Sequence, residues 1–413
     1  MTNADLQGKE KTMISPDEAW QLIASSTTKL KSQAKDLLQA QGSVLVSSVL
    51  APLDLPMFNN SAMDGFAIRY ADIAAGITTF KVRGIVPAGK SEPHKSLKRA
   101  EAFKIFTGAL IPAGADTIVI REHVREEPDQ IFINEAPLTK GAHIRVKASQ
   151  LKKGKTALMQ GHVIGPASIG FLASLGISKV RVFAKPKITV IITGDELRLP
   201  GEKLQTGEIF ESNSYALQSA LLGCGIESNA VYRVKDTEKQ VIAALKKALL
   251  KSDMVILTGG ISAGDYDFVK TALPKTGVKS IFYKIAQKPG KPLFYGKKKN
   301  TSVFALPGNP ASVLSCFYEY VYPAIRLMQG FTNPFVEKRK GALIQDYNKT
   351  YNFALFLKGR TEGLTIHILE GQGSDVLMSF ALADCLVYFP PGKKMFTKGE
   401  LVDVHLIPNS FGQ

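Results

Sequence analysis

The sequence predicts a multidomain α/β protein. A domain with a mainly parallel sheet is joined to a helical segment, a β-rich insertion and a C-terminal β-barrel or sandwich. From Ile188 to Met328, apolar runs alternate with helical patterns, the order of elements that builds parallel sheets. On either side, shorter apolar runs are separated by glycine, proline and charged turns, as in antiparallel β structure. With 413 residues, the chain is long enough for about two to four such domains.

The first part of the chain is expected to be helical from Ser15 to Leu50, because Ser15-Pro16-Asp17-Glu18 resembles a helix cap and first turn. A β-rich module follows between Phe80 and Gly141. Its expected strands are Phe80–Val86, Ala102–Phe106, Thr117–Ile120 and Gln130–Ile133. Another helix is expected over Ile164–Leu175, since Gly176 is a residue type that often follows a helix end.

The central region pairs each expected strand with a following helix. The strands are Ile188–Thr193, Val231–Val234, Met254–Thr258 and Ser302–Leu306. The helices are Ser212–Leu222, Glu238–Leu250, Phe268–Leu273 and Ala311–Met328. After Gly330, short strands return, with turns at Gly371–Ser374 and Pro391-Gly392. The predicted domains are a helical one in two pieces (13–51 and 143–184), the β-rich insertion (52–142), the α/β domain (185–328) and the barrel (329–413).

Composition narrows the class of protein. The 45% hydrophobic and 21% charged residues are ordinary for a soluble protein. No apolar run reaches the roughly 20 residues of a membrane span, and the first residues lack the apolar core of a signal peptide. We therefore expect a cytoplasmic protein that does not enter a membrane.

Charge and metal-binding residue types narrow the class further. The net charge of +16 favours anionic partners, but the lysines form short scattered clusters. A solvated surface is the simpler explanation and an anionic metabolite the alternative, while nothing beyond charge supports nucleic acid. Cys224, Cys316 and Cys385 lie far apart in apolar settings, which predicts buried free thiols. Six histidines without an HExxH pattern argue against a catalytic transition-metal site.

The most informative segment is Asp253–Asp267, where a buried strand leads into a loop of glycines and carboxylates. Free N–H groups in such a loop and at the next helix start can hold an anion. Asp265 and Asp267 would repel a bare phosphate, so they imply a divalent cation beside the anion, or a proton-transfer role. The loop therefore predicts binding of a phosphate together with a hard metal ion.

Two further loops are expected beside this one. Ligands of open α/β sheets bind at the carboxyl ends of the strands. The loops Thr193–Glu196, Thr258–Asp267 and Pro307–Pro310 each follow a predicted strand, so they should meet at one edge of the sheet.

Seven motifs along nearly the whole chain resemble the molybdopterin molybdenumtransferases, the family of MoeA and the gephyrin E domain. They occur in the family's order and approximate spacing. The motifs are Asn60–Ala67, Phe106–Ala109, Thr193–Leu197, Ser212-Asn213, Thr258–Ser262, Lys288–Pro292 and Leu306–Pro310.

The resemblance implies a transferase late in molybdenum cofactor biosynthesis. Such an enzyme binds adenylylated molybdopterin and molybdate, inserts the metal and releases AMP. The resemblance also implies a MogA-like three-layer α/β domain, Mg²⁺ or another divalent cation, and an elongated homodimer whose cleft both subunits complete. A MogA-type adenylyltransferase and molybdoenzyme apoproteins are the protein partners it suggests.

Site residues follow from the same motifs. The candidate catalytic residues are Asp64, Thr107, Glu196, Asp236 and Asp267, of which Glu196 and Asp267 are also candidate metal ligands. The candidate substrate-binding residues are Gly259, Gly260, Ser262, Gly264, Lys288, Gly290, Lys291, Pro307, Gly308, Asn309 and Ser312. The two lysines suit molybdate, because a tetrahedral oxyanion needs cationic donors.

Simpler structural roles remain open for these residues. Asp64 and Thr107 could be turn residues, and Glu196 could occupy a first helical turn. Asp236 and Ser312 could cap helices, while the lysines could belong to a solvated loop.

Two positions depart from the family pattern. Ala148-Ser149-Gln150 stands where the family usually has Gly-Glu-Asp, so Gln150 replaces an acidic residue. Leu355 stands where an arginine often follows an acidic-aromatic pair. These changes keep open a non-catalytic carrier or scaffold on the same fold. A MogA-type adenylyltransferase is disfavoured, because its loop has Thr-Gly-Gly-Thr-Gly where this chain has Thr258–Ser262.

Overall fold

A computed structural model describes residues 13–89, 96–134, 138–261 and 268–408 of the chain. It divides into two compact units. One unit holds the described residues up to Gln33, then Gly42–Val46 and Arg181 onward; the other holds Ala34–Gln41 and Ser47–Val180. Strands β1 (Ser32–Asp36) and β12 (Lys179–Phe183) carry the chain between the units. The finer division into four domains stays a prediction.

The larger unit is built around a sheet with the strand order β16-β13-β17-β21-β20-β18. The parallel strands are β16 (Ala230–Val234), β13 (Ile188–Thr193), β17 (Met254–Thr258) and β21 (Thr301–Leu306). The antiparallel strands at one side are β20 (Phe294–Lys298) and β18 (Lys279–Tyr283). Ile192 pairs with Thr258, and Thr258 pairs with Leu306, so the strands end level and their following loops start from the same edge.

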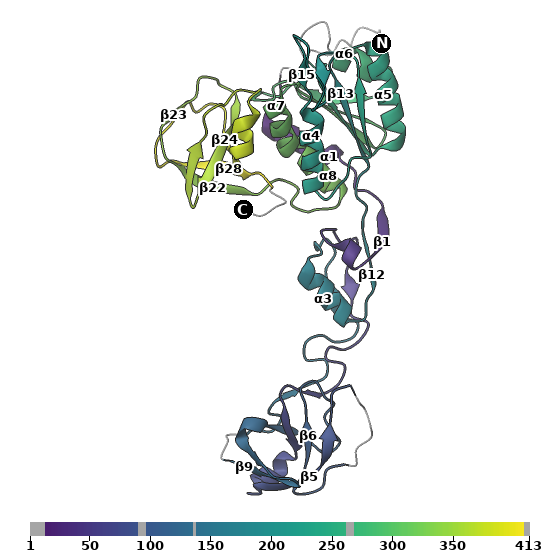
Figure 1. Cartoon of the computed structure of the whole chain (residues 1–413), viewed down its shortest axis with the longest axis vertical. Helices are drawn as coiled ribbons and strands as arrows, with labels where there is room; N and C mark the ends of the chain where they lie inside the picture. Colours follow the sequence, from purple (N-terminus) through teal and green to yellow (C-terminus); the bar gives the residue numbers. More distant parts are fainter. Residues whose placement is uncertain (1–12, 90–95, 135–137, 262–267, 409–413) are drawn as a thin grey trace, which may run out of the picture. The chain divides into compact units, whose positions relative to one another are not determined.

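Alternating side chains of these strands build two cores, which gives three layers. Ile188, Val190 and Ile192 face one core with helices α1 (Pro16–Ser26), α4 (Asn213–Gly223) and α7 (Pro310–Cys316). Ile191 and Val255 face the other core with α5 (Glu238–Lys251) and α6 (Phe268–Lys275). Figure 1 shows α4 and α5 on opposite sides of β13. The predicted parallel α/β domain is confirmed.

The expected long helix over Ala311–Met328 forms in three parts. Helix α7 passes into a π-helical segment, η3 (Phe317–Val321), and then into α8 (Tyr322–Met328). Glu319 of η3 is buried, and its backbone oxygen accepts a 2.9 Å hydrogen bond from the Trp20 indole of α1. Helix α1 is thereby hydrogen-bonded to η3, which follows the last strand and helix α7 of the α/β domain.

The C-terminal strands close into a barrel, as predicted. The order is β24 (Ala354–Glu362), β25 (Thr365–Ile368), β22 (Lys338–Leu343), β28 (Leu401–Leu406) and β26 (Cys385–Phe389). The ring closes because β24 pairs with both β25 and β26. Strand β19 (Gln287–Lys288) adds to β24 from the α/β domain, α9 (Leu377–Leu382) precedes β26, and β23 (Tyr347–Asn348) pairs with β27 (Met395–Phe396). The barrel and the α/β domain therefore share backbone hydrogen bonds.

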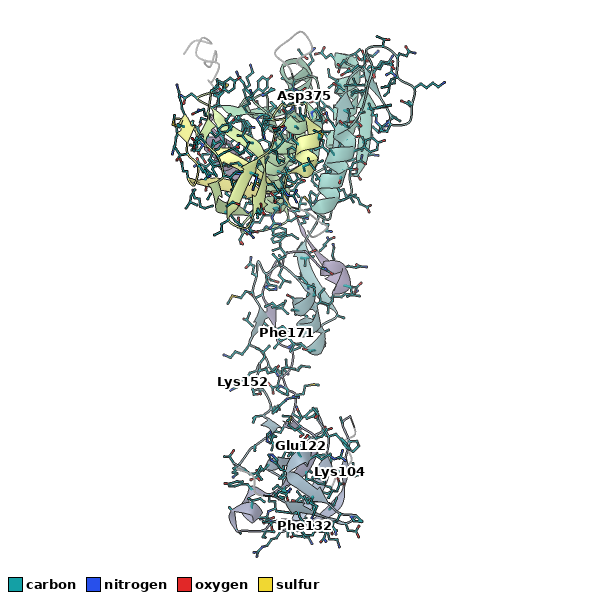
Figure 2. All side chains as sticks on the ribbon, turned by 60° about the vertical axis from the view of Figure 1, so that its left-hand side comes forward. Lys104, Glu122, Phe132, Lys152, Phe171 and Asp375 are labelled. Carbon is teal, nitrogen blue, oxygen red and sulfur yellow. The ribbon has the colours of Figure 1, made fainter. Side chains whose placement is uncertain are left out.

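The smaller unit contains a sheet with the order β7-β4-β6-β5-β9-β8. Its strands are β7 (Thr117–Ile120), β4 (Gly65–Ile68), β6 (Glu101–Ile105), β5 (Thr79–Val86), β9 (Gln130–Ile133) and β8 (Val124–Glu126). Figure 2 labels Lys104 of β6 and Phe132 of β9. Short pairs join β3 (Asn60–Ser61) to β10 (Ile144–Arg145) and β2 (Val49–Leu50) to β11 (Thr156–Leu158), and the helices are α2 (Tyr70–Ala74) and α3 (Pro166–Ser174). The predicted β-rich insertion and the helix near residue 170 are confirmed.

The helical expectation for Ser15–Leu50 is wrong beyond α1. Ser15 caps α1 in a capping box with Glu18, but the helix stops at Ser26, and Thr27 is already extended. The following segment contains β1, a 3₁₀ turn η1 (Leu38–Ala40) and β2. The β-branched residues Thr27 and Thr28 directly follow the last helical residue and favour extended backbone there.

Two expectations from composition can also be compared with the structure. All three cysteines are free thiols; Cys316 and Cys385 are buried, and burial raises the pKa of the partly buried Cys224 to about 12. None of the helices in the described ranges has the length and apolar character needed to cross a lipid bilayer.

Candidate functional site

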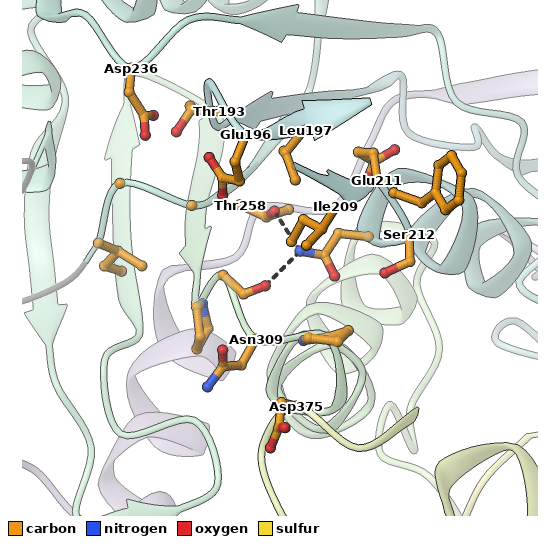
Figure 3. Close-up of a pocket in the computed structure, with 18 of the residues that line it drawn as sticks. Thr193, Glu196, Leu197, Ile209, Glu211, Ser212, Asp236, Thr258, Asn309 and Asp375 are labelled. Atoms are coloured by element: carbon orange, nitrogen blue, oxygen red, sulfur yellow. Dashed lines mark hydrogen bonds between the residues drawn. The ribbon is translucent and has the colours of Figure 1, made fainter. Parts of the chain in front are cut away.

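A cavity of about 730 Å³ lies where the parallel strands end. We call it the strand-end cavity. The described residues of the three loops expected to meet do so here. Its lining includes Thr193 at the end of β13 with Glu196 after it, Thr258 at the end of β17 with Gly259–Ile261 after it, and Pro307–Pro310 after β21 (Figure 3). Asp236, which follows β16, joins them. Glu196, Gly259, Gly260 and Gly308, which come from the loops expected to meet, therefore line one cavity, and Asp236 is an addition to them.

Close backbone packing fixes the floor of this cavity. A Cβ atom at Gly259 would lie 2.6 Å from the carbonyl oxygen of Thr193, and Gly259 has φ +85°. Only glycine fits there without displacing a loop. Asn213, at the start of α4, donates to Thr258 Oγ1 at 3.2 Å and to the Gly308 carbonyl at 2.8 Å, so it ties two loops together (Figure 3).

Oxygen atoms dominate the polar lining. Glu196, Glu211 and Asp236 contribute carboxylates. Glu211 is committed to the start of α4, because it accepts a 2.7 Å hydrogen bond from Ser214 N and another from the Ser214 hydroxyl. By contrast, within the described ranges, Thr193 Oγ1, Asn213 Oδ1 and Asp236 Oδ1 are buried without a hydrogen-bond partner. Such oxygens can accept hydrogen bonds from a ligand or coordinate a hard cation.

The structure excludes the helix-cap or first-turn roles considered for Asp236, Glu196 and Ser312. Helix α5 begins after Thr237, which occupies the N-cap position, so Asp236 is not the cap. Glu196 precedes the short strand β14 (Leu197–Arg198), which pairs with β15 (Ile209–Phe210), rather than starting a helix. Asn309 holds the N-cap position of α7, and Ser312 is buried one turn inside that helix.

The barrel supplies one wall through the loop Gly371–Val376. Asp375 lines the strand-end cavity and is labelled in Figures 2 and 3. The Ser374 carbonyl accepts hydrogen bonds from Ala311 N at 3.0 Å and Ser312 N at 3.2 Å. Asn309 Nδ2 also donates to Ser374 Oγ at 2.7 Å. A loop of the barrel thus satisfies the first N–H groups of α7.

A second cavity of about 440 Å³, which we call the lysine cavity, is also lined by this loop and shares Asp375 with the strand-end cavity. It is lined by Lys288, Pro289, Tyr347, Thr350, Tyr351, Leu355, Leu357, Gln372, Gly373, Ser374 and Asp375. The ammonium of Lys288 lies 4.2 Å from the ring centre of Tyr351, and that of Lys291 lies 5.6 Å from the ring centre of Phe353. Both aromatic rings come from the segment before β24, so the barrel orients both lysines.

Buried side chains hold the turn that follows Lys288 in place. Gln287 is buried and donates its side-chain N–H to the Pro289 carbonyl at 3.0 Å, and its oxygen accepts from the Tyr320 hydroxyl. A Cβ atom at Gly290 would lie 2.4 Å from Cys316 Sγ, with φ +85°. Glycine at this position lets the lysine turn approach α7 closely.

Asp64 and Thr107 meet within the smaller unit. Asp64 Oδ1 accepts hydrogen bonds from Thr107 N and Thr107 Oγ1, both at 2.7 Å. The backbone N–H and then the hydroxyl of Thr107, with a contribution from Arg121, lower the pKa of Asp64 below its ordinary value. Asp64 is therefore a carboxylate at neutral pH, suited to binding a cation or a hydrogen-bond donor rather than to giving up a proton.

Several predicted residues lie outside this description. Ser262, Gly264, Asp265 and Asp267 fall in the range 262–267, which the structure does not describe. In the described ranges, no group of three or more His, Cys, Asp or Glu side chains is placed to hold a metal ion.

Sequence reasoning missed Asp375, because nothing in the turn Gly371–Ser374 marked it for the strand-end cavity. Asn213 could have been found from its motif.

The two departures from the family pattern also have positions. Ala148 has φ +62°, a conformation that favours glycine, which agrees with the glycine the resemblance places there. Gln150 is exposed. Leu355 is buried in the barrel core and pairs with Lys288 across β19 and β24, so a substitution here would reach the lysine cavity directly.

Comparison with known families covers most of the chain. The description "MoeA N-terminal region (domain I and II)" matches residues 14–176, "Probable molybdopterin binding domain" matches 189–327, and "MoeA C-terminal region (domain IV)" matches 340–407. These matches fall on the smaller unit with the first helix, on the α/β domain and on the barrel.

Individual relatives agree. A molybdopterin molybdenumtransferase from Nostoc sp. is 33% identical over 94% of this chain and 92% of its own length. One from Staphylococcus aureus is 32% identical over 96% of both chains. The crystal structure of a molybdopterin biosynthesis MoeA protein from Pyrococcus horikoshii superposes with a TM-score of 0.82 at 29% identity, covering 96% of this chain and all of that one. The chain therefore belongs to the molybdopterin molybdenumtransferase (MoeA) family.

Proposed function

We propose that this protein inserts molybdate into adenylylated molybdopterin and releases AMP, yielding molybdenum cofactor. The observation that carries this proposal is the pair of cavities separated by the loop Gly371–Val376. One is large, oxygen-lined and placed at the strand ends; the other is smaller and lined by Lys288. A nucleotide-linked pterin and a small oxyanion are anions of different size, so they need two adjoining spaces, each with its own source of positive charge.

The strand-end cavity suits the adenylylated pterin. The unpartnered oxygens of Thr193, Asn213 and Asp236 can accept hydrogen bonds from the amino and N–H groups of a pterin or an adenine. Backbone N–H groups at the strand ends are suited to a pyrophosphate. Since Glu196 and Asp236 are acidic, the pyrophosphate needs a cation between it and these carboxylates.

Mg²⁺ or a similar ion fits this donor set. Hard divalent cations take oxygen ligands, and Glu196, Asp236 and Thr193 offer carboxylate and hydroxyl oxygens in one cavity. Asp267, which lies outside the described residues, is the further candidate ligand. Bound there, the ion would neutralise the pyrophosphate and favour departure of AMP.

The lysine cavity suits molybdate. Lys288 gives a charge-assisted donor, the Tyr351 ring keeps its ammonium in place, and the hydroxyls of Ser374 and Thr350 line the same space. Asp375 lines both cavities, so it stands where the oxyanion and the pterin would meet. Tungstate has nearly the same size and charge, so both oxyanions belong in the test.

The smaller unit contributes Asp64 and Thr107 to this proposal. The resemblance implies a homodimer whose cleft both subunits complete, and we propose that the Asp64–Thr107 pair forms part of such a cleft. We further propose that a MogA-type adenylyltransferase supplies the substrate and that molybdoenzyme apoproteins receive the product.

The test is AMP release from adenylylated molybdopterin with Mg²⁺ and molybdate or tungstate. Release should require both the divalent cation and the oxyanion, since the cation neutralises the pyrophosphate and release of AMP accompanies insertion of the metal into the dithiolene of the pterin. Equal release in EDTA and in Mg²⁺ would contradict the proposal.

Gln150 favours one alternative, a non-catalytic carrier of the cofactor, because an amide stands where the family pattern has an acidic residue. A carrier would bind the adenylylated pterin but release no AMP under any condition of the same assay. The proposed transferase would bind the pterin and also release AMP.

A further inference from the structure

Lys358 of β24 is a fully buried lysine, with 2% of its surface exposed. Its ammonium donates to three backbone carbonyls, those of Gly371 at 2.8 Å, Gly373 at 3.0 Å and Val376 at 3.2 Å. A buried ammonium is costly unless it is fully hydrogen-bonded. Three carbonyls use all three of its N–H bonds, so the energetic cost of burial is offset only while this loop keeps its shape.

The three acceptors all belong to the loop Gly371–Val376. Gln372 strengthens the attachment: its amide nitrogen donates to the Lys358 carbonyl at 2.9 Å, and its amide oxygen accepts from Lys358 N at 3.0 Å. Ser379 Oγ adds a 2.7 Å bond to the Gly371 carbonyl. The loop is therefore wrapped around one cation of β24 and joined to that strand at several points.

This loop is also the wall between the two cavities. Ser374 and Asp375 line the lysine cavity, Asp375 lines the strand-end cavity as well, and the Ser374 carbonyl accepts from Ala311 N and Ser312 N. Because the Gly373 carbonyl points at Lys358, the N–H of Ser374 in the same planar peptide unit points away from it. The orientation of the wall thus depends on where the ammonium lies.

We propose that Lys358 is a positioning residue that fixes the loop Gly371–Val376, and through it places Ser374 and Asp375 between the two cavities. Its kinetic consequence rests on the proposed function, while its structural consequence does not. Lys358 touches no substrate; it acts through the loop. Burial lowers the pKa of Lys358, and the nearby Asp375 carboxylate partly opposes this shift.

The structural test is hydrogen–deuterium exchange of the Ala311 and Ser312 amides in Lys358→Met, which removes the charge at similar volume. Loss of the Ser374 carbonyl from α7 should speed exchange of these amides by about tenfold or more. Lys349→Met is the matched control. Lys349 is also buried and donates to the carbonyls of Phe353 and Pro390, outside the loop, so the two amides should exchange as in the unchanged protein.

The kinetic test separates positioning from loss of folded protein. In Lys358→Met, the molybdate concentration for half-maximal AMP release should rise about tenfold, because the Ser374 hydroxyl no longer faces the oxyanion. A purely structural loss would lower the maximal rate and leave that concentration unchanged. Unchanged amide exchange, or faster exchange with unchanged half-saturation, would overturn the proposal.

Two outcomes of these experiments require a different variant or a different measurement. If Lys358→Met shows no cooperative unfolding transition, Lys358→Gln, which keeps two N–H donors without the charge, takes its place with the same readouts. If the unchanged protein releases no AMP, the proposed function fails, and equilibrium titration of molybdate alone replaces the kinetic arm. Weaker molybdate binding in the variant would then support the positioning role, and equal binding would overturn it.

Discussion

Asp64 shows how a single residue's environment fixes its chemistry. Its carboxylate is exposed, yet two hydrogen bonds from Thr107 lower its pKa. A lowered pKa in the folded state stabilises the fold above the unfolded pKa, and this contribution disappears as the pH falls through the lowered value. Asp64 therefore favours the folded unit at neutral pH and ceases to do so in acid.

Replacing Thr107 tests this assignment. In Thr107→Ala, the pKa of Asp64 should move part of the way back toward its ordinary value, because the hydroxyl donor is lost while the backbone N–H remains. Carboxyl ¹³C shifts followed against pH would measure it. Thr107→Ser, which keeps the hydroxyl, should titrate as the unchanged protein does; an identical pKa in Thr107→Ala would show that the hydroxyl contributes nothing.

Ala148 occupies a backbone conformation that L residues avoid. At φ +62° its Cβ is strained, so Ala148→Gly should raise the free energy of unfolding by about 1 kcal/mol. Urea denaturation would measure the change. Ala243→Gly, at an exposed position inside α5, should have the opposite sign and cost about 1 kcal/mol. A loss of stability in Ala148→Gly would contradict the strain.

At the scale of elements, Lys288 at the end of β19 and Lys291 in the turn before β20 are the two candidate oxyanion ligands. Lys288→Ala should weaken molybdate binding about 10- to 100-fold, the effect of losing one charge-assisted hydrogen bond, with little change in pterin binding. Lys291 does not line the cavity, so Lys291→Ala should have the smaller effect. Separate calorimetric titrations of molybdate and pterin would measure both. A Lys288→Ala protein that loses only pterin affinity would contradict the assignment.

The periodic elements were predictable because their side chains record burial directly. Continuous apolar runs such as Ile188–Thr193 are buried on both faces of a parallel sheet, and their loops must meet at the strand ends. The segment after Ser26 was not predictable in this way. Its helix-compatible residues pair as short strands instead, because tertiary contacts override weak local preference.

The candidate site was predictable only where one domain supplies it. Glu196, Gly259 and Gly308 follow consecutive strands of one sheet, so strand order alone brings them together. Asp375 of the barrel lines the same cavity, and Lys358 acts by donating hydrogen bonds to the loop that carries Asp375. Their contributions depend on how two domains pack, which no local pattern encodes.

At the scale of the larger unit, a buried pair joins the barrel to the α/β domain. His405 Nδ1 of β28 lies 2.8 Å and 2.9 Å from the two carboxylate oxygens of Glu319, and both residues are almost fully buried. Removing one member leaves the other buried and unpaired, so Glu319→Ala should lower the free energy of unfolding by about 3–5 kcal/mol. Urea denaturation of this variant would measure the loss.

An exposed ion pair nearby provides the control for that measurement. Glu337 pairs with Arg339 at 2.7 Å, and both side chains are mostly exposed to solvent. Glu337→Ala should therefore change the free energy of unfolding by no more than about 1 kcal/mol. Equal losses in the Glu319 and Glu337 variants would mean that the buried pair adds nothing beyond surface charge.

The bond from Trp20 to Glu319 spans 299 residues of sequence, which has a consequence for how the protein is made. At a synthesis rate of roughly 5–20 residues per second, α1 leaves the ribosome about 15–60 s before the segment that receives its indole. Throughout that interval, the apolar side chains of Trp20 and Ile23 cannot pack against η3 and α8, because those segments have not yet been synthesised. The nascent chain therefore offers chaperones an early apolar helix, while residues 47–180 of the smaller unit are already complete.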